Sequence, residues 1–119
     1  MSGQLVLDAP LAHVRWDPPD LSPSGDAAVA ILLHGMGGGR EAWGDAMSST
    51  GRHIAQAGMV AIAVDLPGYG DSLPQNPLTM TGMAQAVLAL QDWLGVRQAV
   101  ILGHSMGGMV AQELHAIAP

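Results

Sequence analysis

The fold is decided by one stretch, Ala99-Val100-Ile101-Leu102-Gly103-His104-Ser105-Met106-Gly107-Gly108. Apolar residues run into a Gly-x-Ser-x-Gly motif, and a segment with helical spacing follows. This pattern predicts a strand, a sharp turn with Ser105 at its tip, and a helix. The strand and helix then pass so closely that the residues two before and two after the serine must be small, as Gly103 and Gly107 are. We therefore predict that Ser105 is a nucleophile. The alternative is a structural turn whose serine caps the helix.

Outward from this turn, apolar runs predict the centre of a sheet. The runs are Ala28 to Leu33, Met59 to Val64 and Ala99 to Leu102. Because they are apolar without alternation, they are typical of strands covered on both faces, and we predict that all three are buried.

Helices are predicted after each of these strands. One lies in the later part of 40–58, one runs from Thr79 or Thr81 to Gly95, and one follows the serine turn. The last two carry apolar stripes at helical spacing, formed by Met83, Val87, Leu90 and Leu94 and by Met106, Val110, Leu114 and Ala118.

Two short segments near the N-terminus predict a hairpin. They are Gln4 to Leu7 and Leu11 to Trp16, and His13 and Arg15 take alternate positions in the second. The alternation predicts that both side chains face solvent. The order of all the elements predicts one α/β domain over residues 1–119. Its sheet is mostly parallel, with the antiparallel hairpin at its N-terminal side and helices on both faces.

The composition excludes several classes of function. The 119-residue chain has a net charge of −6, four Lys and Arg together, and no Cys. Without a basic patch, we expect no nucleic-acid partner and no membrane partner. Without cysteine there is no disulfide framework and no cysteine zinc site. No histidine pair has metal-ligand spacing on one helix face, so we expect neither a metal nor another cofactor.

The sequence also bears on location. No apolar run approaches the ~20 residues of a membrane span. The N-terminus lacks the basic and apolar regions of a signal peptide. We therefore expect a cytoplasmic protein.

A second motif, His34-Gly35-Met36-Gly37-Gly38, follows the first apolar run. A glycine-rich turn exposes backbone N–H groups, and the N–H of Met36 with that of Met106 would make a two-donor oxyanion hole. A phosphate cradle is the alternative. It is weak, because Arg40 stands where the third glycine of a dinucleotide motif should fall. In addition, the next strand-end acid, Asp65, comes 30 residues after Gly35 instead of the expected ~20.

A third motif, Asp65-Leu66-Pro67-Gly68-Tyr69-Gly70-Asp71-Ser72, follows the second apolar run. It predicts a turn in which Asp65 accepts hydrogen bonds from local N–H groups. Two histidines flank the proposed site. We predict that His34 orders its loop and is not a base, and that the side chain of His104 points away from the serine hydroxyl.

Together the three motifs resemble the N-terminal half of an α/β-hydrolase. The similar group contains small esterases, lactonases, C–C-bond hydrolases and cofactor-free haloperoxidase-like enzymes. The resemblance implies that Ser105 is the nucleophile and that Met36 and Met106 supply the oxyanion N–H groups, with His34, Gly35, Gly103, His104 and Gly107 supporting them. A serine here, instead of an aspartate, speaks against haloalkane dehalogenase and epoxide hydrolase chemistry.

The resemblance also implies that two catalytic groups, the triad acid and the base histidine, are absent from these 119 residues. In this family the triad acid follows a later strand and the base histidine lies near the C-terminus, so both would fall beyond Pro119. We therefore expect a truncated chain with a partial α/β-hydrolase fold whose later strands are missing. A serine without its base is a poor nucleophile, so the chain alone is expected to be inactive or weakly active.

These observations leave two main functional hypotheses open, with a nucleotide-binding α/β domain as a third and weaker one. The first is a serine hydrolase acting on a small ester or related acyl substrate. The second is a non-catalytic module of the same fold that binds a small molecule or associates with itself. In either case the segment Ala99 to Leu102 would be an exposed edge strand, and we expect self-association through it.

Overall fold

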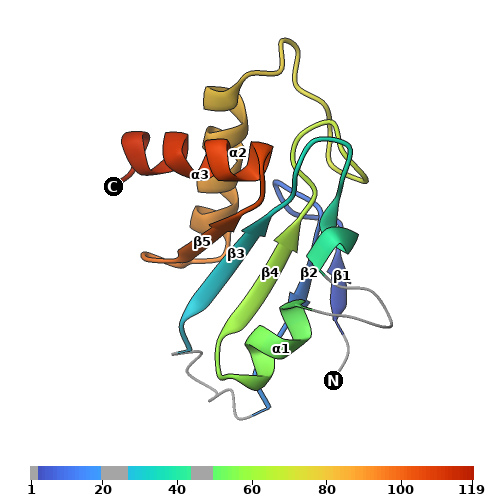
Figure 1. The fold of residues 1–119 in the computed structure, drawn as a ribbon, viewed down its shortest axis with the longest axis vertical. Coiled ribbons are helices and arrows are strands. Elements are labelled where there is room, and N and C mark those ends of the chain that lie inside the picture. The colour runs from blue at the N-terminus through green and yellow to red at the C-terminus, as the bar shows by residue number, and fades with distance from the viewer. Residues whose placement is uncertain (1–2, 20–26, 44–49) are drawn as a thin grey trace.

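A computed structural model of the chain describes residues 3–19, 27–43 and 50–119 (Figure 1). Within these residues the strands are β1 (Gln4–Val6), β2 (His13–Trp16), β3 (Val29–Leu33), β4 (Val60–Val64) and β5 (Val100–Gly103). The helices are the short 3₁₀ helix η1 (Arg40–Trp43), α1 (Thr50–Gln56), α2 (Met80–Trp93) and α3 (Met106–Ile117). No helix in these ranges is long and apolar enough to cross a membrane.

The described strands form one sheet in the order β1-β2-β4-β3-β5. The strands β4, β3 and β5 run parallel, with Ile31 level with Ile62 on one side and with Ile101 on the other. The hairpin of β1 and β2 joins the edge of β4 antiparallel. The predicted fold class, a mostly parallel sheet with an N-terminal antiparallel hairpin, is confirmed.

Alternate residues of β3 and β4 enter two separate apolar cores, as the two-residue period of a strand requires. On one face Ile31, Leu33 and Ile62 pack with the buried stripes of α2 and α3. On the other face Leu32 and Ala63 pack with α1 and Trp16. Both faces of the central strands are thereby covered, which is why these strands are continuously apolar.

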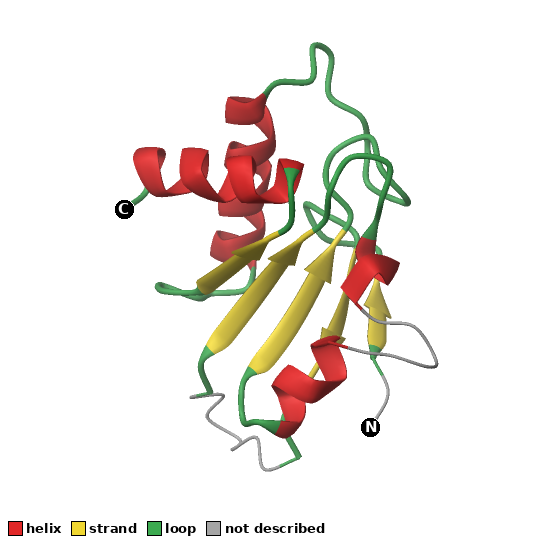
Figure 2. Ribbon diagram, viewed as in Figure 1, coloured by secondary structure: helices red, strands yellow, loops and turns green. Residues whose placement is uncertain are grey.

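The positions of the helices follow from the strand order. β4 lies on one side of β3 and β5 lies on the other. Connections between parallel strands are right-handed, so a reversal of direction sends the helices to opposite faces. Figure 2 shows α1 on one face and α2 with α3 on the other. The chain therefore continues from β3 and from β5 to helices on opposite faces of the sheet, and such a switch point is where open α/β sheets bind ligands.

The predicted helix ends agree with the structure where it is described. Thr79 is the N-cap of α2, and its hydroxyl accepts from the N–H of Gly82 at 2.9 Å. Gly95, with a φ of 72°, follows its end, and Gly58, with a φ of 103°, follows α1. The first half of the helix predicted within 40–58 includes residues 44–49, which lie outside the described residues, as do 20–26 of the predicted loop.

Three burial predictions drawn from local patterns are wrong. β5 is not buried as its apolar run predicts: Val100 is 52% exposed and Leu102 is 41% exposed, because β3 is its only strand neighbour among the described residues. This agrees instead with the exposed edge strand expected for Ala99 to Leu102. Ala118 does not extend the stripe of α3, because the helix ends at Ile117 and Ala118 is exposed. His13 is not a solvent-facing residue: only 1% of it is accessible, because Trp93 of α2 packs edge-on against its ring at 6.1 Å.

Burial gives His13 a pH-dependent effect on stability. Burial lowers its pKa by more than the hydrogen bond to the Leu11 carbonyl raises it. Below about pH 6.5 the unfolded chain therefore binds a proton at His13 that the folded protein does not. We predict that the free energy of unfolding falls as the pH is lowered from 7.5 to 5.5, and that His13→Gln flattens this fall. Denaturant titrations of the parent and the variant at several pH values measure the free energy of unfolding.

The matched control for this prediction is His53→Gln, because His53 lies exposed on α1. This variant should keep the parent's dependence on pH. Parallel curves for the parent and His13→Gln would contradict the assignment.

The exposed edge of β5 carries a prediction about assembly. An apolar edge strand with unpaired N–H and C=O groups is a template for pairing with a second copy. We expect the 119-residue chain to self-associate in sedimentation experiments, and we expect Val100→Lys to reduce the association. Leu73→Lys, at an exposed loop position, is the control and should not change it. A monodisperse monomer of the parent chain would contradict the prediction.

Candidate active site

Ser105 stands at the corner between β5 and α3. Only His104 and Ser105 separate the end of the strand at Gly103 from the start of the helix at Met106. The backbone of Ser105 has a φ of 54° and a ψ of −113°, and it is the single non-glycine residue with positive φ among those described. Such a conformation costs ~1–3 kcal/mol and persists only where the surroundings enforce it. The Ser105 side chain makes no capping hydrogen bond to α3, so it does not act as a helix cap.

The glycines beside Ser105 allow this corner to form. A Cβ on Gly103 would overlap the backbone of Gly107, and a Cβ on Gly107 would overlap the carbonyl of Leu33 at the end of β3. A Cβ on Gly108 would instead come no closer than 3.6 Å to other atoms, which is an ordinary contact. Gly103 and Gly107 therefore have a steric role that Gly108 lacks.

The turn after β3 lies directly beside the serine. The N–H of Gly38 donates to the carbonyl of Gly35 at 3.0 Å, and Gly37 has a φ of 79°, which makes 35–38 a turn of type II character with Met36 at its second position. A Cβ on Gly35 would lie 3.0 Å from Nδ1 of His104 and 3.4 Å from Cβ of Ser105. Gly35 thus marks where the two loops touch, and the His104 ring lies against this turn.

Met106 begins α3 immediately after the serine. Its N–H belongs to the first turn, where backbone N–H groups find no acceptor within the helix. Its side chain is buried, and the Tyr69 hydroxyl lies 3.8 Å from its sulfur atom. The carboxyl edge of the sheet therefore brings together Ser105, the turn that carries Met36, and the start of α3.

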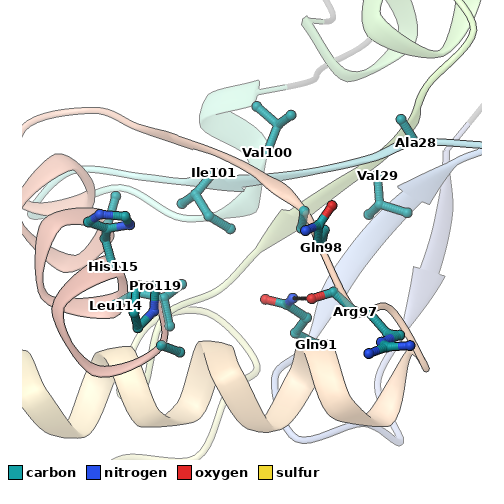
Figure 3. Close-up of a pocket in the computed structure, with 13 residues that line it drawn as sticks. Ala28, Val29, Gln91, Arg97, Gln98, Val100, Ile101, Leu114, His115 and Pro119 are labelled. Atoms are coloured by element: carbon teal, nitrogen blue, oxygen red, sulfur yellow. Dashed lines mark hydrogen bonds between the residues drawn. The ribbon is translucent and has the colours of Figure 1, made fainter.

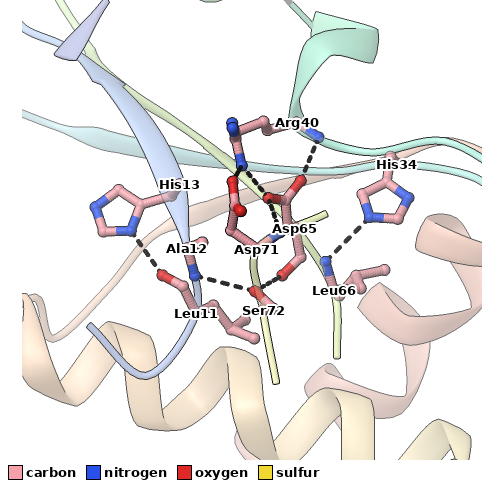
Figure 4. Close-up of polar contacts among 9 residues, drawn as sticks. All are labelled: Leu11, Ala12, His13, His34, Arg40, Asp65, Leu66, Asp71 and Ser72. Atoms are coloured by element: carbon pink, nitrogen blue, oxygen red, sulfur yellow. Dashed lines mark hydrogen bonds and ion pairs between the residues drawn. The ribbon is translucent and has the colours of Figure 1, made fainter. Parts of the chain in front are cut away.

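His34 is fully buried, and both of its ring nitrogens are engaged. Figure 4 shows its contact with Leu66. Nε2 accepts from the N–H of Leu66 at 3.0 Å, so it carries no proton. Nδ1 lies 2.8 Å from the carbonyl oxygen of Gly35, which can only accept, so Nδ1 carries the proton. His34 is therefore a neutral tautomer that joins two loops and has no free nitrogen with which to act as a base.

The sequence did not reveal an ion-pair cluster next to this turn. The carboxylate of Asp65 is fully buried and accepts from the guanidinium of Arg40, from the Arg40 N–H at 2.8 Å and from the Asp71 N–H at 3.1 Å. Nη1 of Arg40 also donates to Asp71 at 2.8 Å. Burial lowers the pKa of the guanidinium, but the hydrogen bond to Asp71 and the charge of Asp65 outweigh this effect and raise it.

Ser72 joins this cluster to the N-terminal hairpin. Its hydroxyl donates to the carbonyl of Asp65 and accepts from the N–H of Ala12 at 3.0 Å (Figure 4). Sequence reasoning missed both this contact and the Arg40 ion pair. No local pattern signals them, because the partners are 60 and 25 residues apart.

A groove of the described surface lies away from this site. It encloses about 660 Å³ at the starts of β3 and β5, between the ends of α2 and α3, and is lined by residues such as Val29, Val100, Leu114 and His115 (Figure 3). Ser105 lies at the opposite ends of the strands and does not line it. Among the described residues, no group of three or more histidine, aspartate or glutamate side chains is arranged to hold a metal ion.

The steric difference between the glycines gives a test of the corner. Gly107→Ala pushes a methyl group into the carbonyl of Leu33, so it should lower the free energy of unfolding by about 2–3 kcal/mol. Gly108→Ala places a methyl group at ordinary contact distance within α3, where alanine is favoured over glycine by up to ~1 kcal/mol. Thermal or denaturant unfolding of the two variants measures the difference. Equal effects would contradict the close approach of α3 to β3.

The sequence of the chain is similar to those of known proteins. Residues 30–118 match the alpha/beta hydrolase family. An acetyltransferase component of the acetoin cleaving system of Cupriavidus necator is 38% identical over 96 residues, covering 80% of this chain and 24% of that protein. A pimeloyl-[acyl-carrier protein] methyl ester esterase of Pectobacterium carotovorum is 34% identical over 89 residues, covering 75% of this chain and 31% of the esterase.

Solved structures share the fold. The crystal structure of an epoxide hydrolase from Vigna radiata superposes with a TM-score of 0.76 at 23% identity, covering 99% of this chain and 35% of the epoxide hydrolase. The chain thus spans about a quarter to a third of the length of these relatives. Because residues 30–118 match the family and the chain shares its architecture, the chain belongs to the alpha/beta hydrolase family.

Proposed function

We propose that the protein carrying this sequence is a serine hydrolase that cleaves small esters or related acyl compounds, with Ser105 as the nucleophile. The observation that carries the proposal is the strained backbone of Ser105, with φ at 54° and its hydroxyl unused by the helix that follows. Strain of this kind concentrates at functional sites. A serine exposed at a strand-to-helix corner is the arrangement that presents a nucleophile above a sheet.

The proposed reaction has two steps. Oγ of Ser105 attacks the carbonyl carbon of the substrate and gives its proton to a general base, while the N–H groups of Met36 and Met106 hold the negative oxygen. The intermediate collapses, and the alcohol leaves with the proton from the base. Water, deprotonated by the same base, then attacks the acyl-serine and releases the acid and free Ser105.

The proposal assigns the base and its supporting acid to parts of the protein outside these 119 residues. Among the described residues, no histidine is hydrogen-bonded to the Ser105 hydroxyl, and His34 has both ring nitrogens engaged. We therefore expect the 119-residue chain alone to have little activity, because a serine without its base is a poor nucleophile at neutral pH.

The names of the relatives support the choice of substrate class. One relative is an esterase of a methyl ester and another is an acetyltransferase component, so both names describe chemistry at an acyl carbon. The epoxide hydrolase shares the fold alone, at 23% identity. A small-molecule ester is therefore the substrate that we propose.

A fluorophosphonate probe tests the proposal in the full-length protein. We predict rapid labelling that peptide mass spectrometry locates at Ser105, and loss of labelling in Ser105→Ala. Heat-denatured protein is the control and should not be labelled, because reactivity depends on the folded site. A folded full-length protein that leaves Ser105 unlabelled would refute the proposal and favour a non-catalytic binding module.

A further inference from the structure

The turn that carries Met36 has no apolar anchor of its own. Met36 is 79% exposed, and the next two residues are exposed glycines. Glycine-rich backbone has many accessible conformations, so contacts elsewhere must fix this turn. An oxyanion donor stabilises a transition state only when it is already held in position, and displacements of about 1 Å are costly.

Polar contacts hold the turn at both of its ends, and Figure 4 shows those of Arg40 with Asp65 and of His34 with Leu66. At the first end, Nδ1 of His34 donates to the carbonyl of Gly35 at 2.8 Å, while Nε2 of the same ring accepts from Leu66. At the second end, the N–H and the guanidinium of Arg40 both bind the carboxylate of Asp65. Both anchors therefore lie in the loop that begins where β4 ends.

The Arg40 anchor is built from buried charge. The side chain of Asp65 has no exposed surface, and that of Arg40 is 20% exposed. A buried carboxylate needs several donors, and Asp65 has the Arg40 guanidinium, the Arg40 N–H and the Asp71 N–H. The carboxylate of Asp71, whose side chain is 53% exposed, accepts a hydrogen bond from the same nitrogen, Nη1 of Arg40. The two carboxylates fix where Arg40 lies, and Arg40 fixes the end of the glycine turn.

We propose that Arg40 is a positioning residue for the oxyanion hole. Its ion pairs with Asp65 and Asp71 hold the segment from Gly35 to Arg40 against the loop after β4, and this keeps the N–H of Met36 aimed at the oxygen of the intermediate. The role rests on the proposed function, because it requires that Met36 be an oxyanion donor. Arg40 acts through the backbone and does not touch the substrate.

The test measures ester hydrolysis by the full-length protein with p-nitrophenyl acetate. In Arg40→Met the charge and the guanidinium donors are lost, and we expect kcat to fall about 100-fold with KM changed less than about threefold, as for loss of one oxyanion donor. Arg40→Lys keeps a charge near Asp65 and should recover part of kcat. The matched control is Arg15→Met, which removes an exposed ion pair with Asp17 and should leave kcat unchanged.

A second readout separates positioning from a general loss of structure. A boronic acid forms a tetrahedral adduct with the serine and places an oxygen at the oxyanion donors. Its inhibition constant should rise across the Arg40 variants in parallel with the loss of kcat/KM, measured at a temperature where circular dichroism shows each variant folded. A loss of kcat that only follows the unfolded fraction, with unchanged boronate affinity of the folded protein, would overturn the proposal.

Asp71→Asn keeps the test decisive if Arg40→Met does not fold. Asp71 is half exposed, so its neutralisation leaves no buried unpaired charge, and we expect a two- to fivefold fall in kcat. An unchanged kcat and boronate affinity in a folded Arg40→Met or Asp71→Asn variant would overturn the positioning role. If the parent protein itself neither turns over the ester nor labels at Ser105, the proposed function fails, and the role of Arg40 fails with it.

Discussion

The site depends on one close approach of backbone to backbone. Gly107, in the first turn of α3, lies against the carbonyl of Leu33 at the end of β3, and Gly103 lies against Gly107 in turn. This leaves so little space that the chain can pass from β5 to α3 only through a tight corner. Ser105 takes the positive φ that the corner requires, at 54°. The same approach sets the first turn of α3 beside the turn after β3, so the proposed nucleophile and both proposed donors depend on it.

A second constraint acts on the loops that follow β3 and β4. The loops after β3 and β4 are joined by polar groups that are buried: the ring of His34, the carboxylate of Asp65 and the hydroxyl of Ser72. Each of these groups accepts a hydrogen bond from a backbone N–H of a distant segment: His34 from Leu66, Asp65 from Arg40 and Ser72 from Ala12. The apolar cores lie on the two faces of the sheet, and Leu66 and Tyr69 of the loop after β4 pack into one of them. Buried hydrogen bonds and ion pairs therefore act together with this apolar packing to hold the loops.

The sequence predicted most of the features that local residue patterns determine, and few of those that depend on contacts between residues far apart in the chain. The central strands, the ends of α2 and the small residues around Ser105 follow from apolar runs, caps and glycine spacing. The pairing of Arg40 with Asp65 and Asp71 does not, because these residues are 25 and 31 positions apart and their contact arises only when the loops meet. The burial of His13 likewise depends on Trp93 of a distant helix.

The most direct test of the central claim is a crystal structure of the full-length protein after reaction with an organophosphate. The account predicts a phosphorus atom bonded to Oγ of Ser105, with one phosphoryl oxygen about 2.7–3.1 Å from the backbone nitrogens of both Met36 and Met106. Retention of the positive φ of Ser105 in that adduct would show that the corner is built before reaction. A phosphoryl oxygen directed away from both nitrogens, or an adduct on another residue, would contradict the account.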